Sequence, residues 1–216
     1  MKQILFLLLA VVGLFSACSE KENVSTEYAN WQARNQAAFI DTLRTANAAI
    51  AQAKAQWGDD WQAHCDWRTF RSYALAEEAQ ATWKDSIAVR VLVEGQGSGT
   101  PLYSDTVRVV YVGRLMPTEE NPKGLTFDYS GVTSDLTQAF HPQLAKPAQF
   151  AVSNVVEGFS TALQHMHIGD RWRLFMPAEM AYEGKSSGKV PAYSMLVYDT
   201  ELRSFWRVGN QPISWQ

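Results

Sequence analysis

The chain has 216 residues and a formal net charge of -3, from 19 basic and 22 acidic side chains. Its hydrophobic content of 46% is ordinary for a globular protein, which excludes a disordered or fibrous chain. No long run of like charge occurs, so we expect no nucleic-acid partner.

Residues 1–17 combine a lysine with an apolar run that is too short to span a bilayer, and they are predicted to be a secretory signal peptide. The sequence Phe15-Ser16-Ala17-Cys18 resembles a bacterial lipobox, which implies cleavage before Cys18 and acylation of its thiol. We therefore expect a lipoprotein of the bacterial cell envelope, held at the outer membrane and facing the periplasm or the cell surface. Residues 18–27 would be the lipidated cysteine and a spacer. The alternative is an ordinary cleaved signal peptide, in which Cys18 is incidental.

The second cysteine and the histidines give no sign of chemistry. With Cys18 lipidated, Cys65 lacks a disulfide partner, and we interpret it as a buried thiol. His64 precedes it directly, but adjacent side chains on a helix or strand point apart. His165 and His167 would likewise face different directions on a helix, and no third ligand is evident, so no metal is expected.

Residues 28–85 are predicted to be a helical accessory region. The stretch 28–57 is predicted to be an amphipathic helix that ends at Gly58. Residues 61–85 are predicted to hold a short helix and then an edge strand. The seam of the long helix must be buried, either on this chain or against a second copy as a homodimer. Its apolar positions are Phe39, Leu43, Ala46, Ile50, Ala53 and Trp57.

From residue 86 the apolar pattern changes to alternation, which is typical of strands. One short helix interrupts them, with Phe159, Ala162, Leu163 and Met166 on one face and Gly169 as its stop. This order favours the α+β class, with an antiparallel sheet wrapped on a short helix. The predicted strands are 87–93, 106–115, 149–153, 171–176 and 194–205.

Two motifs identify a family. Val107–Leu115 reads V-R-V-V-Y-V-G-R-L and Thr126–Ser130 reads T-F-D-Y-S, which resemble the V-x-V-x-Y-x-G-x-L and F-D-S-S motifs of FKBP-type peptidyl-prolyl cis/trans isomerases. Further motifs follow in family order, and together they are far more specific than any one alone. The resemblance covers residues 86–205, leaves 206–216 as a C-terminal tail, and implies an FKBP-like antiparallel half-barrel. The further motifs are Val155–Phe159, Met166–Asp170, Ala181-Tyr182, Val190-Pro191 and Leu196–Leu202.

The resemblance also implies an aromatic pocket for a proline ring, with no cofactor and no metal. Phe159 would form its floor, the Val156 N–H and the Tyr182 hydroxyl would bond carbonyls of the bound peptide, and Asp128 would accept from the Tyr111 hydroxyl. Its partners would be proline-containing polypeptide clients and, by family resemblance, macrolide inhibitors. The remaining substrate-binding side chains would be Phe127, Phe150, Val155, Val190 and Tyr198.

The expected chemistry breaks no bond. Rotation about an X–Pro amide crosses a barrier of about 18–20 kcal/mol because resonance is lost as the amide twists. A dry aromatic pocket can favour the twisted amide over the planar, well-solvated one. Aromatic residues on strands are usually core residues, so the assignment to a pocket depends on the motif order.

The sequence departs from the family pattern in several places. Phe159 stands where Trp is common, Tyr198 stands where Phe is usual, and Val190-Pro191-Ala192 replaces Ile-Pro-Pro. Glu183 follows Tyr182 where the family has Gly, which could alter the loop unless Gly184 compensates. An extra stretch from Gly131 to Lys146 is expected to form a surface loop near the pocket.

Two other functions remain open at this point. One is a non-catalytic module that binds proline-containing segments or acts as a holdase chaperone lipoprotein. The other is a structural envelope lipoprotein that dimerises through residues 28–57.

Overall fold

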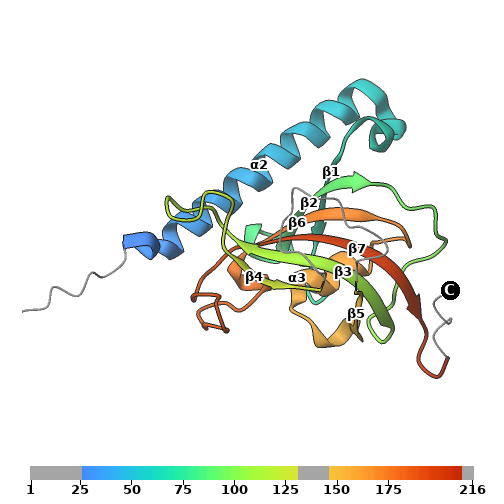
Figure 1. Cartoon of the computed structure of the whole chain (residues 1–216). Coiled ribbons are helices and arrows are strands. Elements are labelled where there is room, and N and C mark those ends of the chain that lie inside the picture. The colour runs from blue at the N-terminus through green and yellow to red at the C-terminus, as the bar shows by residue number, and fades with distance from the viewer. Residues whose placement is uncertain (1–25, 131–145, 211–216) are drawn as a thin grey trace, which may run out of the picture.

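The computed structural model describes residues 26–130 and 146–210 (Figure 1). The predicted signal peptide, Cys18 and nearly all of the expected surface loop lie outside these ranges. Within them, no helix is both long enough and apolar enough to cross a membrane.

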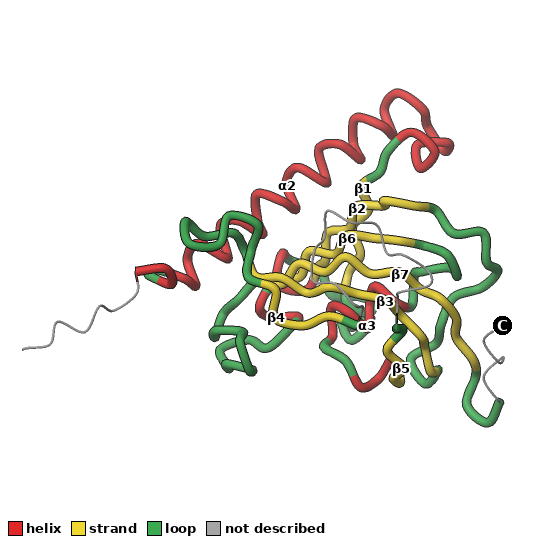
Figure 2. Tube along the Cα trace, in the orientation of Figure 1, coloured by secondary structure: helices red, strands yellow, loops and turns green. Residues whose placement is uncertain are grey.

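The described part of the chain forms one seven-stranded antiparallel sheet in the order β1-β2-β6-β7-β3-β4, and β5 pairs with β3. The long helix α2, Trp31–Trp57, crosses one face of the sheet, and the short helix α3, Glu157–Leu163, lies against the other (Figures 1 and 2). The predicted α+β class, with a sheet wrapped on a short helix, is confirmed. The strands are β1 Trp67–Arg71, β2 Ser86–Val93, β3 Thr106–Leu115, β4 Thr126–Tyr129, β5 Ala148–Ala151, β6 Arg171–Met176 and β7 Leu196–Trp206.

Successive side chains of a strand point to opposite faces of the sheet, and this alternation explains which of them are buried in the core. On β6, the side chains of Trp172, Leu174 and Met176 are buried, whereas the residues between them are only half-buried. On β2, Ala88 is buried together with Ile87 and Val89 on the other face. Since α2 packs against β1, β2 and β6, both faces of β2 are covered.

The short helix ends earlier than the sequence predicts. Gly169 was expected to stop it, but α3 ends at Leu163 and is capped by Gln164 in ordinary right-handed geometry. Gly169, at φ 95°, lies instead in the turn before β6, where its N–H donates to the Leu202 carbonyl over 2.8 Å. The prediction for Gly169 was wrong because the positive φ belongs to this turn.

Helix α2 spans Trp31–Trp57 and buries its seam on the sheet of its own chain. It starts three residues later than predicted, because Thr26–Tyr28 forms a 3₁₀ turn and Asn30 adopts a left-handed conformation. At the other end Gly58 has φ 54° and its N–H donates to the Lys54 carbonyl, so the helix stops there as predicted. The buried positions are Trp31, Asn35, Phe39, Ala46, Ile50 and Ala53.

Two residues near α2 differ from their predicted burial. Trp57 was placed in the seam but is 44% exposed, and it stacks on His64 with 3.7 Å between ring centroids. Cys65 was interpreted as a buried thiol but is only half-buried, with its Sγ 3.8 Å from the Trp67 carbonyl.

The sheet extends beyond the boundary expected at residue 86. Gly58–His64 forms a 3₁₀ helix and β1 is an edge strand, as predicted. However, β1 pairs with β2 in the register Trp67↔Arg90, and Trp31 belongs to the main hydrophobic core. Residues 28–85 and 86–205 therefore share one sheet and one core.

The N-terminal 3₁₀ turn includes residues that the sequence placed in the spacer. Glu27 accepts hydrogen bonds from Thr118 Oγ1 at 2.6 Å and from Asn121 Nδ2 at 2.8 Å, and these bonds lower the pKa of its carboxyl. Residues 26 and 27 of the predicted spacer are therefore part of the fold.

Candidate active site

An aromatic cluster lies between the sheet and α3. It consists of Tyr111 on β3, Phe127 on β4, Phe150 on β5, Phe159 on α3 and Tyr198 on β7. The ring centroids of Phe159 and Tyr198 are 5.1 Å apart, those of Phe127 and Tyr198 5.5 Å, and those of Tyr111 and Tyr198 5.8 Å. The ring centroid of Phe159 is also 6.1 Å from that of Tyr111 and 6.2 Å from that of Phe150. These separations are typical of packed aromatic pairs, so the five rings form one contiguous surface.

A glycine on β3 allows two of these rings to meet. Gly113 pairs with Tyr198 in the sheet. A Cβ at this position would lie 2.7 Å from Phe127 Cζ and 2.8 Å from Tyr198 Cε1. Because real Cβ atoms do not approach other atoms so closely, any larger residue would displace the rings.

Tyr111 is held in place by one hydrogen bond from its side chain and one from its backbone. Its hydroxyl donates to Asp128 Oδ2 over 2.9 Å, and its backbone N–H donates to Ser130 Oγ over 2.8 Å. Burial, and then the bond to Asp128, raise the pKa of the Tyr111 phenol well above its ordinary value. The phenol is therefore neutral at physiological pH and faces a fixed acceptor.

Two further phenols lie beside Tyr111. Tyr198 is 7% exposed, and burial raises the pKa of its hydroxyl well above the ordinary value. Tyr182 packs half-buried against the core that includes Tyr198, and it makes a smaller electrostatic contribution to the raised pKa of both Tyr111 and Tyr198. No residue in the described ranges forms a hydrogen bond with the Tyr182 hydroxyl.

The start of α3 presents a backbone donor to the same region. Val156 is the N-cap residue, with φ -59° and ψ 149°, and it packs half-buried against the core as Val155 does. Among the described residues, none accepts a hydrogen bond from the Val156 N–H. Val190, 2% exposed, belongs to the core that includes Phe159 and Tyr198.

The structure thus gathers all ten site residues that the motifs suggest in one region. Nine belong to the hydrophobic core or pack against it, and Asp128 is attached through Tyr111. Five helices and strands and two loops contribute to this region, which is mainly aromatic and carries few polar groups. The ten residues are Tyr111, Asp128, Val156, Phe159, Tyr182, Phe127, Phe150, Val155, Val190 and Tyr198.

Glu183 adopts a left-handed backbone conformation, which glycine adopts more readily than other residues. Its φ is 52°, its N–H donates to the Ala178 carbonyl, and its carbonyl accepts from the Tyr193 N–H, both over 2.7 Å. Gly184 does not compensate, because it is not among the residues with positive φ. The loop after Tyr182 therefore holds a strained glutamate, fixed by these two backbone hydrogen bonds.

Sequence reasoning missed the contacts that the loop before β7 makes with α2. Trp31 Nε1 donates to Ser194 Oγ over 2.8 Å, and Asn35 Oδ1 accepts from the Met195 N–H over 2.9 Å. The spacing of Trp31, Asn35 and Phe39 extends the predicted seam by two turns, and this was the available signal.

The histidines do not form a metal site in the described ranges, where no group of three or more candidate ligands occurs. His165 stacks on Phe70 with 3.9 Å between ring centroids, and burial lowers the pKa of its imidazole. It acts as a packing residue between β1 and the end of α3.

The family model for FKBP-type peptidyl-prolyl cis-trans isomerases matches residues 97–203. The chain is 32% identical over 138 residues to a macrophage infectivity potentiator of Trypanosoma cruzi, which covers 63% of this chain and 62% of that protein. It is also 32% identical over 127 residues to an FKBP-type 22 kDa peptidyl-prolyl cis-trans isomerase of Escherichia coli K12, covering 58% and 53%. A third relative, the outer membrane protein MIP of Legionella longbeachae, is 35% identical over 99 residues, covering 46% and 35%.

The matched stretches thus span from about a third to just over three fifths of these relatives' own lengths. The match to the family model includes β3, β4, β5 and α3, and β7 as far as residue 203. The chain belongs, through residues 97–203, to the family of FKBP-type peptidyl-prolyl cis-trans isomerases.

Proposed function

We propose that the chain catalyses cis/trans isomerisation of X–Pro peptide bonds, with proline-containing polypeptides as its substrates. The observation that carries this proposal is an aromatic cluster with two hydrogen-bond donors beside it, the Val156 N–H and the Tyr182 hydroxyl, which lack partners among the described residues. The rings offer an apolar surface for the proline ring, and the two donors suit carbonyls of the flanking peptide.

The reaction is a rotation, so the site needs no nucleophile and no acid/base pair. A planar prolyl amide is polar and well solvated, whereas the twisted amide has lost part of its resonance and its charge separation. Transfer to a dry aromatic surface therefore costs the twisted amide less free energy than the planar amide. The raised pKa values of Tyr111 and Tyr198 keep the walls uncharged, which preserves this difference.

The required effect is modest. An acceleration of a thousandfold needs about 4 kcal/mol of preference for the transition state. One hydrogen bond that strengthens as the amide twists, together with the loss of ground-state solvation, is of this order. The few polar groups of the site are sufficient for such a mechanism.

The test is a protease-coupled prolyl isomerisation assay on the purified chain. We expect acceleration over the spontaneous rate, with Phe159→Ala lowering kcat/KM by more than tenfold because the buried ring is lost. Tyr182→Phe keeps the ring and removes the hydroxyl, and we expect it to lower kcat/KM about tenfold. Catalysis absent from a chain with native circular dichroism would reject the proposal; binding of proline peptides without catalysis would identify a binding module instead.

We also propose that the chain is anchored in the cell envelope by a lipid on Cys18. The support is the lipobox-like sequence and the name of the Legionella longbeachae relative, an outer membrane protein. Expression with a radiolabelled fatty acid should label the chain, and Cys18→Ser should abolish both the label and membrane association. Unchanged labelling of Cys18→Ser would contradict this assignment.

A further inference from the structure

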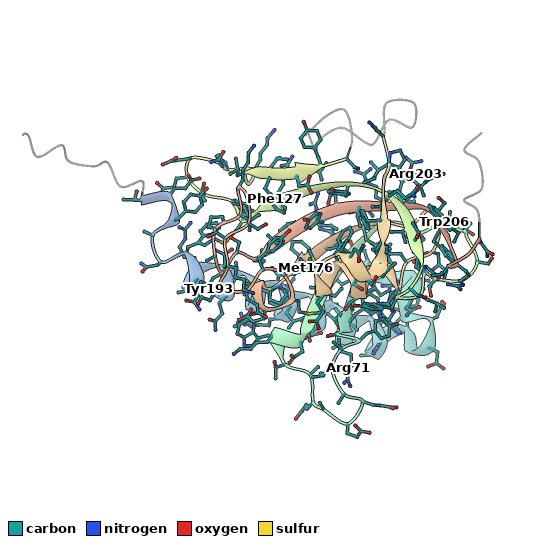
Figure 3. The ribbon with its side chains drawn as sticks, turned by 90° about the horizontal axis from the view of Figure 1, so that it is seen from below. Arg71, Phe127, Met176, Tyr193, Arg203 and Trp206 are labelled. Carbon is teal, nitrogen blue, oxygen red and sulfur yellow. The ribbon has the colours of Figure 1, made fainter. Side chains whose placement is uncertain are left out.

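The loop between Tyr182 and β7 contributes two of the site residues, Tyr182 and Val190. Its last residues, Ser194 and Met195, are 3% and 4% exposed and lie against the first turns of α2. Figure 3 shows Tyr193 beside the N-terminal part of α2, at the opposite end of the sheet from Trp206. The helix thus reaches the loop directly, although the two are about 160 residues apart in sequence.

Buried hydrogen bonds join the helix to the loop. Trp31 Nε1–H donates to Ser194 Oγ over 2.8 Å, and the same hydroxyl donates to the Pro191 carbonyl over 2.7 Å. Asn35 Nδ2 donates to the Trp31 carbonyl over 2.7 Å, and Asn35 Oδ1 accepts from the Met195 N–H over 2.9 Å. Trp31 is 6% exposed and Asn35 is 2% exposed, so water does not compete for these bonds.

The loop needs such support because it holds strain. Glu183 and Tyr193 both adopt left-handed conformations, at φ 52° and φ 60°. Non-glycine residues persist there only where their surroundings hold them. The Tyr193 N–H donates to the Glu183 carbonyl over 2.7 Å, so the anchored end of the loop restrains the residue next to Tyr182.

We infer that Trp31 and Asn35 are positioning residues of the isomerase site. Through Ser194 and Tyr193 they fix the loop that presents the Tyr182 hydroxyl and Val190 to the substrate. This inference rests on the proposed isomerase function, and it assigns the N-terminal helix a part in the reaction besides covering the sheet.

A structural role alone would predict a different response to mutation. The helix is also held by its apolar seam, including Phe39 and Ile50, against β1, β2 and β6. Loss of one hydrogen bond to the loop should therefore leave α2 docked. Its effect should be confined to the loop and to catalysis.

The experiment compares Ser194→Ala with Ser194→Thr, which keeps the hydroxyl, and with Trp31→Phe, which keeps a ring but lacks the N–H. Asn47→Ala is the matched control, because Asn47 lies on the exposed side of α2, where its Oδ1 accepts from Thr69 Oγ1 over 3.4 Å. Hydrogen–deuterium exchange of residues 182–195 and of α2 is measured together with kcat/KM.

In both Ser194→Ala and Trp31→Phe, we expect hydrogen–deuterium exchange in the loop to be about tenfold faster. We also expect kcat/KM of both variants to be about tenfold lower. Exchange in α2 should stay as in the unmodified chain, Ser194→Thr should restore both quantities, and Asn47→Ala should change neither. Loop exchange that stays unchanged in both variants, or that rises equally throughout the chain, would overturn the inference. An unmodified chain without isomerase activity would reject the proposed function, while the exchange data would still test the anchoring.

Discussion

Replacing Glu183 by glycine should stabilise the protein without altering its site. Glu183 is an exposed residue at φ 52°, in a region that disfavours any side chain with a Cβ. Its two backbone hydrogen bonds, to Ala178 and from Tyr193, do not involve the side chain. Glycine can therefore adopt the same backbone conformation and keep both bonds.

The expected increase in the free energy of unfolding is the difference between two opposing contributions. A left-handed conformation costs a residue with a Cβ about 1–2 kcal/mol, and glycine does not incur this cost. Glycine loses about 0.4–1 kcal/mol more than alanine in chain entropy on folding. The difference is a net stabilisation of about 0.5–1 kcal/mol, which corresponds to a rise in Tm of about 1–4 °C for a chain of this size.

Urea unfolding and thermal melting of Glu183→Gly and Glu183→Ala give the measurement. Alanine removes the carboxylate but keeps the Cβ, so its free energy of unfolding should stay within about 0.5 kcal/mol of the unmodified chain. We expect kcat/KM of Glu183→Gly to change less than about twofold. An equal gain from both variants would assign the effect to charge, and destabilisation by glycine would refute the argument from strain.

Three further predictions concern packing and charge. Gly113→Ala should cost about 1–3 kcal/mol in urea unfolding and lower kcat/KM, because the added methyl overpacks the two rings that meet there; unchanged stability would contradict the close contact. Asp199 is 1% exposed and accepts from Arg173 Nε at 2.7 Å and Nη2 at 2.9 Å, so Asp199→Ala should destabilise by about 3 kcal/mol. Burial lowers the pKa of His165 from 6.5, so the unfolded chain binds the proton more readily and stability should fall as pH falls below about 7. His165→Gln should reduce this slope in Tm against pH, and an unchanged slope would assign it to other groups.

The strands were predictable where a run of alternating apolar and polar residues is bounded by turn-forming residues. The bounds of β3 and β6 agree with the prediction, because each strand follows a clear break and keeps one apolar face. The site was predictable only from the order of the motifs. Phe127 and Tyr198 could equally have been core residues, and Tyr198 is in fact both a core residue and part of the aromatic cluster.

What the sequence did not reveal depends on contacts across long separations. The bond between Trp31 and Ser194 joins residues 163 positions apart, and no local pattern encodes it. Glu183 illustrates the same limit, because a missing glycine suggested a changed loop, whereas neighbouring hydrogen bonds hold the glutamate in the conformation that glycine would adopt.

The packing around β2 leads us to predict that a chain beginning at residue 86 is less stable than the unmodified chain. β2 buries Ile87 and Val89 on one face and Ala88 on the face that α2 covers, and its free edge is occupied by β1. A chain that began at residue 86 would expose an unpaired strand edge and an apolar face together, a combination that favours aggregation. It would also lose Trp31 and Asn35, which hold the loop beside the aromatic cluster. We therefore expect a truncated chain to keep both the sheet and the loop contacts only if it includes α2.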